Sequence, residues 1–280
     1  MTPRTTANSR FWKQKAADYV LSRRNADGGY TFWQGADSNA QDTYYGLAIM
    51  RLLASPLPNV GETVKWLRGF ELGNVYSYYY VGKSLLLCGE TMDDRFKKYV
   101  GSAIMSRRHF ESVDVYVEFA SEFQAASMVL EIARLVEFDL DDRGGGLVDW
   151  LLGFRNRDGG FGVHENSNIN STYYAVSSLR MLGFDINRMQ DTVAFVRKCE
   201  KPNGGFTVIP HAYEPYVEYT FYGVMALEAL NEKCRFPSRT VDFLLRCQNN
   251  NGGFARSDLG VSAFEYTFQA VNVMQKLAQP

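Results

Sequence analysis

The chain has 280 residues, of which 46% are hydrophobic and 22% charged, and its net charge of −1 lacks the basic excess that a nucleic-acid surface needs. No apolar run approaches the roughly 18 residues that span a membrane, so no transmembrane segment is expected. The start of the chain lacks a signal pattern and the 4 cysteines are widely spaced, which predicts free thiols and a cytoplasmic protein.

A short turn recurs along the chain as a polar residue, two glycines and an aromatic residue. The copies read NADGGYTFW, NRDGGFGVH, KPNGGFTVI and NNNGGFARS. Glycine after Asn or Asp supplies backbone with positive φ at low steric cost and ends a helix. A phosphate-binding loop would need Lys and Ser or Thr after the glycines, and these are missing. We therefore interpret the copies as structural turns that mark a repeat.

The segments around the turns alternate between amphipathic and almost wholly apolar helices. Amphipathic segments such as TVDFLLRCQ (240–248) bury one face, whereas apolar segments such as STYYAVSSLRML (171–182) fit helices enclosed by others. The last three turns lie roughly 45 residues apart, and the wider gap after the first turn holds two copies without glycines. In chain order the helix pairs are expected at about 11–53, 60–89, 93–136, 146–184, 187–231 and 236–277.

Six helix pairs predict an all-α fold, an (α/α)6 toroid in which the second helix of each pair forms the inner wall. The first and last copies are no more polar than the middle ones, which favours a closed ring over an open solenoid. Residues 1–280 are then expected to form a single toroid domain.

The repeat resembles that of protein prenyltransferase β-subunits and of squalene–hopene and terpene cyclases. The best matches are RCQNNNGGF (246–254) and FRNRDGGFG (154–162), and the resemblance covers about residues 11–277. It implies an aromatic-lined central cavity that holds an isoprenoid or another apolar ligand. Because the fold serves several reactions as well as binding proteins, the function has to be argued from individual residues.

The resemblance to prenyltransferases implies a zinc site at the start of the inner helices. Here its Asp-x-Cys positions fall on Tyr216 and Glu218, and its His position falls on Glu265. Two carboxylates without Cys or His make a poor thiolate-activating zinc site. We therefore expect no zinc, while a Mg²⁺ ion between Glu218 and Glu265 stays open. A helical partner subunit stays open too, although nothing in the sequence indicates one.

The resemblance to terpene cyclases implies an Asp-x-Asp-Asp motif whose middle residue protonates an alkene or epoxide. The chain has DLDD at 139–142, but this segment follows an inner helix, so we expect it at the opposite mouth, where acids cap the next helix. In the matching register stand Gln41, Asp42 and Thr43. A glutamine amide in the place of the acid cannot donate the proton.

The starts of the inner helices therefore carry the candidate site. They gather at one mouth of a toroid, and carboxylates brought together there raise one another's pKa, so that one can act as a general acid. The catalytic candidates are Asp42, Glu218 and Glu265. The substrate-binding candidates at the same level are Gln41, Glu122 (or Glu118, because the third copy aligns poorly), Tyr44, Tyr79, Tyr173, Tyr219 and Tyr266. The alternative is that the acids only complement helix termini and the tyrosines only fill a core.

These features favour an enzyme that processes isoprenoids or terpenoids, similar to class II terpene cyclases. It would bind a polyprenyl-type substrate in the aromatic-lined cavity and use carboxylate acid catalysis. Two alternatives stay open: a toroid that binds an apolar ligand without catalysis, and a zinc-less protein similar to prenyltransferase β-subunits. Lys83 and Arg180 are the candidate basic residues near the inner helices.

Overall fold

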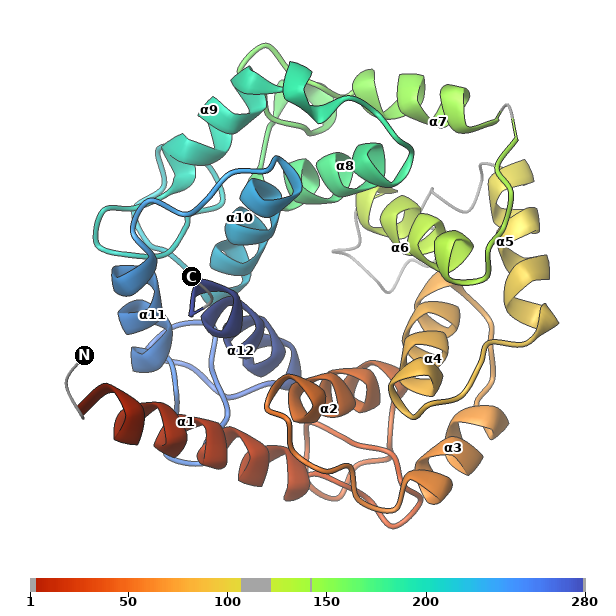
Figure 1. The fold of residues 1–280 in the computed structure, drawn as a ribbon, viewed down its shortest axis with the longest axis vertical. Coiled ribbons are helices and arrows are strands. Elements are labelled where there is room, and N and C mark those ends of the chain that lie inside the picture. Colours follow the sequence, from red (N-terminus) through yellow and green to blue (C-terminus); the bar gives the residue numbers. More distant parts are fainter. Residues whose placement is uncertain (1–3, 107–121, 142, 279–280) are drawn as a thin grey trace.

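The computed structural model describes residues 4–106, 122–141 and 143–278, which form a ring of α-helices in two layers (Figure 1). The outer helices are α1 (Arg4–Leu21), α3 (Val60–Gly69), α5 (Asp94–Ser106), α7 (Arg143–Leu152), α9 (Gln190–Cys199) and α11 (Pro237–Arg246). The inner helices are α2 (Ala40–Leu52), α4 (Val75–Leu87), α6 (Glu122–Leu135), α8 (Ile169–Met181), α10 (Val217–Ala229) and α12 (Phe264–Leu277). Two short 3-10 turns lie at Val163–Glu165 and Ile186–Arg188.

The inner helices close on themselves. Each packs against the next in chain order, and α12 packs against α2 (Figure 1). Each outer helix covers the inner helix of its own pair. The predicted all-α toroid of six repeats, and its closure, are therefore confirmed.

The four repeated turns anchor the inner helices through their aromatic residues, which are completely buried. The backbone N–H of each aromatic residue donates a hydrogen bond to the threonine side chain that stands fourth in the following inner helix. The pairs are Tyr30–Thr43, Phe161–Thr172, Phe206–Thr220 and Phe254–Thr267. The turns are thus structural, as the sequence predicts, and each one fixes where its inner helix begins.

The same turns attach each repeat to the next outer helix. In the last turn Gly252 has a φ of 92°, and a Cβ placed there would lie 2.0 Å from the carbonyl oxygen of Lys15 in α1. Four residues earlier, Gln248 Nε2 donates to the carbonyl of Trp12 in α1 at 3.0 Å. Because α1 belongs to the first repeat, these contacts help to close the ring.

Replacing Gly252 by alanine should destabilise the protein by about 3 kcal/mol, because the new methyl group would meet the α1 backbone in a left-handed conformation. Gly35 is the matched control, since its φ is 88° and a Cβ added to it would have no neighbour within 4 Å. Gly35→Ala should cost only about 1 kcal/mol. Urea unfolding measures both free energies, and equal losses would contradict the close contact at Gly252.

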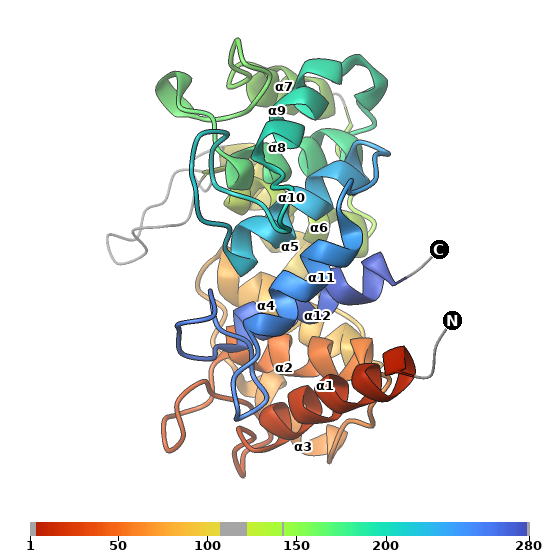
Figure 2. The same cartoon turned by 90° about the vertical axis from the view of Figure 1, so that its left-hand side faces the viewer.

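The loops that lead into α2, α8, α10 and α12 project from one side of the ring, and the C-terminal end of α12 lies on the other (Figure 2). The inner-helix N-termini therefore share one mouth, hereafter the N-terminal mouth. Among the described residues no helix is both long and apolar enough to cross a membrane.

Candidate functional site

Two chambers lie inside the ring, and both are walled by inner helices. The outer chamber, at the N-terminal mouth, has a volume of about 1510 Å³. The inner chamber, of about 460 Å³, reaches Arg51 and Leu87 near the C-terminal ends of α2 and α4. Tyr80, Tyr174 and Tyr222 line both chambers and so mark the boundary between them.

Each inner helix brings a polar side chain from its first turn to the border of the outer chamber. In five helices this is the second residue, and in α6 it is the third. We call this set the polar collar, and its members are Gln41, Tyr76, Gln124, Asn170, Glu218 and Glu265. The repeat thus brings chemically different groups to equivalent points around one mouth.

Glu265 is the collar member best suited to hold a proton. Burial raises its pKa to about 7, and the negative charges of Glu218 and Asp42 act in the same direction. One turn further along α12, Gln269 donates from Nε2 to Glu265 Oε1 at 3.2 Å. A carboxyl group that is protonated near neutral pH and borders a cavity can act as a general acid.

This proton should make stability depend on pH. The native pKa of Glu265 lies near 7, above the usual value of about 4.3, so the stabilising effect of the proton is full below about pH 4.3 and is lost as the pH rises to about 7. Relative to Glu265→Gln, the wild type should lose about 3 kcal/mol of unfolding free energy between about pH 4 and about pH 8. Chemical denaturation of both proteins across this pH range measures the two unfolding free energies. If both free energies changed with pH by the same amount, the raised pKa of Glu265 would be contradicted.

Glu218, the second carboxylate of the collar, is held in an ion pair. Arg256, in the loop before α12, donates to Glu218 Oε1 from Nη2 at 2.6 Å and from Nε at 3.1 Å. The same Nη2 donates to Tyr219 at 3.0 Å, and the guanidinium lies 4.2 Å from the centre of the Tyr216 ring. This pair fixes a negative charge at the mouth, where it disfavours ionisation of Glu265.

Asp42, the third predicted catalytic residue, faces the loop before α2 and borders neither chamber. Its Oδ2 accepts hydrogen bonds from the backbone N–H of Phe32 and from Asn39 Nδ2, both at 2.7 Å, and burial raises its pKa. Neighbouring helix residues point about 100° apart, so Gln41 faces the chamber and Asp42 does not. The structure therefore places Asp42 against the turn before α2, where its charge acts on Glu265 from a distance, and its catalytic role stays a prediction.

The model of the prenyltransferase alpha-alpha toroid domain family matches residues 4–71 and 117–279. The chain belongs to this prenyltransferase toroid family. No curated protein is found that matches it in sequence.

Solved structures of prenyltransferase toroids share the fold. Protein geranylgeranyltransferase-I from Candida albicans, complexed with GGPP, superposes with a TM-score of 0.71 at 17% identity, over 94% of this chain and 90% of that chain. A variant of the type II terpene cyclase MstE from Scytonema, in complex with geranylgeranyl dihydroxybenzoate, gives a TM-score of 0.61 at 13% identity, over 96% and 97% of the two chains. At these identities the likeness concerns the fold.

The donor atoms of this toroid do not fit zinc at the inner-helix starts. Tyr216, Glu218 and Glu265 occupy the positions that the resemblance assigns to zinc ligands, and the first two contact Arg256. Zinc sites prefer thiolate and imidazole ligands. Within the described ranges no group of three or more His, Cys, Asp or Glu side chains is placed to hold a metal ion.

The predicted tyrosines occupy two levels of the toroid instead of one. Tyr219 and Tyr266, third in their helices, border the outer chamber. Tyr44, Tyr79 and Tyr173, fifth in theirs, border the inner chamber because they lie deeper along the helices.

Other candidates lie away from both chambers. Glu122 borders neither chamber, and Gln124 is the residue of α6 that borders the outer chamber. Glu118 lies outside the described residues. Arg180 donates from Nη1 to the carbonyls of Glu228 and Ala229, so it ties α8 to the end of α10. In DLDD, Asp139 and Asp141 are exposed between α6 and α7, away from the N-terminal mouth, and Asp142 lies outside the described residues.

Several cavity residues were missed by sequence reasoning. Tyr45, Tyr80, Tyr174 and Tyr222 directly follow an aromatic residue in the YY and FY pairs of the inner helices, and aligning those pairs would have found them. Arg256 had no local signal, because its loop lies next to Glu218 only in the folded ring.

Proposed function

We propose that this prenyltransferase toroid is an isoprenoid-processing enzyme of the class II cyclase type, with Glu265 as the general acid. The observation that carries the proposal is a carboxyl group with a pKa of about 7 on the border of the outer chamber, whose lining also includes Tyr80, Tyr174 and Tyr222. The choice of an isoprenoid is supported by fold relatives in complex with GGPP and geranylgeranyl dihydroxybenzoate.

The reaction starts when Glu265 gives its proton to a carbon–carbon double bond of a polyprenyl chain. The electron pair of that bond forms the new C–H bond and leaves a carbocation on the neighbouring carbon. A second double bond attacks this cation and closes a ring, and loss of a proton to water ends the sequence. The product is then an isomer of the substrate, and the Glu265 carboxylate recovers a proton from solvent in the outer chamber.

Aromatic faces that line the inner chamber support the cationic stage. Tyr45 and Tyr80 share a hydroxyl contact of 3.4 Å, and Tyr174 and Tyr222 share one of 3.1 Å, which holds the four rings in place. The Phe268 ring centroid lies 5.2 Å from that of Tyr45. Aromatic faces attract cations, and burial raises the pKa of these tyrosines, so the phenols stay neutral at physiological pH.

Incubation with polyprenyl substrates tests the proposal. Geranylgeranyl and squalene-like polyenes are supplied to the wild type and to Glu265→Gln, and the extracts are analysed by gas chromatography and mass spectrometry. We expect an isomeric cyclic product from the wild type alone. No product from any polyene, or equal product from both proteins, would overturn the proposal.

A second candidate is a toroid that binds an apolar ligand without catalysis. It is favoured by Gln41, which occupies the acid position of the cyclase resemblance and donates from Nε2 to the Tyr80 hydroxyl at 3.2 Å. Native mass spectrometry of the purified protein separates the two: a retained lipid that is never converted supports the binding role.

A further inference from the structure

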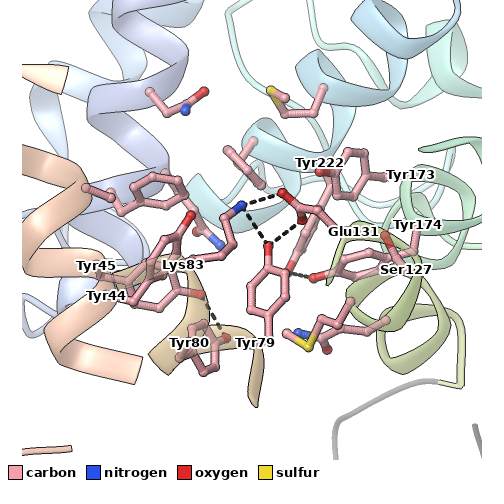
Figure 3. Close-up of a pocket in the computed structure, with 18 of the residues that line it drawn as sticks. Tyr44, Tyr45, Tyr79, Tyr80, Lys83, Ser127, Glu131, Tyr173, Tyr174 and Tyr222 are labelled. Carbon is pink, nitrogen blue, oxygen red and sulfur yellow. Dashed lines mark hydrogen bonds and ion pairs between the residues drawn. The ribbon is translucent and has the colours of Figure 1, made fainter. Parts of the chain in front are cut away.

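The inner chamber contains a charged pair that the proposed acid chemistry does not use. Lys83 of α4 forms an ion pair with Glu131 of α6, and Tyr79 accepts a hydrogen bond from Lys83 Nζ at 3.2 Å and donates one to Glu131 at 2.7 Å (Figure 3). The Lys83 and Glu131 side chains are only 21% and 27% exposed. Partly removing an ion pair from water carries a desolvation cost that apolar side chains would avoid. Its presence on a cavity wall therefore points to a polar group of a ligand.

Two hydrogen-bond acceptors from α12 lack donors in the same chamber. Gln269 and Asn272 both line it, and among the described residues neither Gln269 Oε1 nor Asn272 Oδ1 has a partner. Gln269 is 2% exposed, so little water reaches it. In the ring α12 lies across from α6, which carries Glu131 (Figure 1). A ligand that brings a hydrogen-bond donor would satisfy these oxygens.

The charges of the inner chamber favour an uncharged donor. Lys83 and Glu131 neutralise each other, and Arg51 already donates from Nε and Nη2 to the carbonyl of Leu87 at 3.0 and 2.6 Å. A diphosphate would need cations that are free to bind it. An ammonium ligand would meet the positive charge of Lys83. A hydroxyl group donates and accepts hydrogen bonds without a net charge, and it suits this wall best.

We infer that the inner chamber is a subsite for the hydroxyl group of an isoprenoid alcohol, between the Lys83–Glu131 pair and the amides of Gln269 and Asn272. That the ligand is an isoprenoid rests on the proposed function. The hydroxyl subsite adds a polar anchor in the inner chamber, and the tyrosine rings lie between this anchor and Glu265. The chamber volume of about 460 Å³ lies within the range of small-molecule sites. A chain anchored there passes its double bonds along the tyrosine rings and presents its far end to Glu265.

Equilibrium binding of three matched ligands tests this subsite. The ligands are geranylgeraniol, the same hydrocarbon chain without the hydroxyl group, and geranylgeranyl diphosphate, each delivered from cyclodextrin in a calorimetric titration. For the wild type, geranylgeraniol should bind about tenfold more tightly than the hydrocarbon, because it satisfies a buried acceptor. The diphosphate should bind more weakly than the alcohol.

Two matched variants locate the hydroxyl group. Asn272→Leu removes an unpaired oxygen from the inner chamber, and Asn170→Leu removes one from the outer chamber. We expect the preference for the alcohol to vanish in Asn272→Leu and to persist in Asn170→Leu. Equal binding of alcohol and hydrocarbon by the wild type, tighter binding of the diphosphate, or the same behaviour of both variants would overturn the inference. Because only binding is measured, this result is separate from whether Glu265 supports turnover.

Discussion

Glu265→Gln should lower isoprenoid turnover by about 10³-fold, because glutamine keeps the shape and the hydrogen bond from Gln269 but has no proton to give. The wild-type rate should also fall as the pH rises through about 7, where Glu265 ionises. Initial rates for both proteins across this pH range are the measurement.

A matched change elsewhere shows whether the effect belongs to the acid. Glu228→Gln alters a half-exposed carboxylate on α10 that pairs with Lys276 at 2.7 Å, and its rate should stay close to that of the wild type. If Glu265→Gln retained most of the activity, the proton would come from another group. If the wild-type rate rose with pH through 7, an ionised Glu265 would be the active form and the proposed role would be wrong.

Glu200→Gln should cost about 4 kcal/mol of unfolding free energy, the largest stability loss that we expect from a single charge. The Glu200 carboxylate, with no exposed side-chain surface, joins the end of α9 to the start of α11. It accepts hydrogen bonds from the Arg235 Nε at 2.8 Å, the Arg197 Nη1 at 3.2 Å, and the backbone N–H groups of Arg235 and Phe236. Glutamine has no negative charge, and its NH₂ group would replace one carboxylate oxygen. This new donor would then face the N–H donors of the arginines and the backbone.

The pH dependence of Glu200→Gln gives a second readout. Burial opposes the ionised form of Glu200, but hydrogen bonds from Arg235 and Cys234 overcome it and lower the pKa. The contribution is therefore full above the usual value of about 4.3 and is lost as the pH falls through the lower native pKa. Urea unfolding should show the gap between wild type and variant closing in acid. Glu232→Gln is the control, because Glu232 is a partly exposed partner of Arg197, and it should cost less than about 1 kcal/mol of unfolding free energy. Similar losses in both variants would contradict the expected large contribution of the buried Glu200 carboxylate.

Much of the fold follows from local pattern. The Gly-Gly-aromatic turn and the alternation of amphipathic with apolar segments predict helix pairs, and the structure shows those pairs closed into a ring. The same repeat brought Glu218 and Glu265 to equivalent points, and both border the outer chamber. Gln41 reaches that chamber from the same position of its helix, whereas Asp42, one residue later, points into the loop.

The remaining site residues depend on segments that are distant in the chain. Glu218 meets Arg256 38 residues later, and Lys83 meets Glu131 48 residues later. Glu131 lies in the segment EFQAASMVLEIARL, and no spacing rule links it to a lysine in another repeat.

The sequence by itself determined the ring of six helix pairs, its structural turns and the presence of Glu218 and Glu265, without Cys or His, at the inner-helix starts. These features rest on residue periodicity, on glycine conformation and on the identity of single side chains, all of which act locally. Only the tertiary structure decided that burial raises the pKa of Glu265, that Asp42 accepts hydrogen bonds from the turn before α2, and that Lys83 and Glu131 pair inside a second chamber. Burial and charge at these points are set by helices from different repeats, so they exist only once the ring has closed.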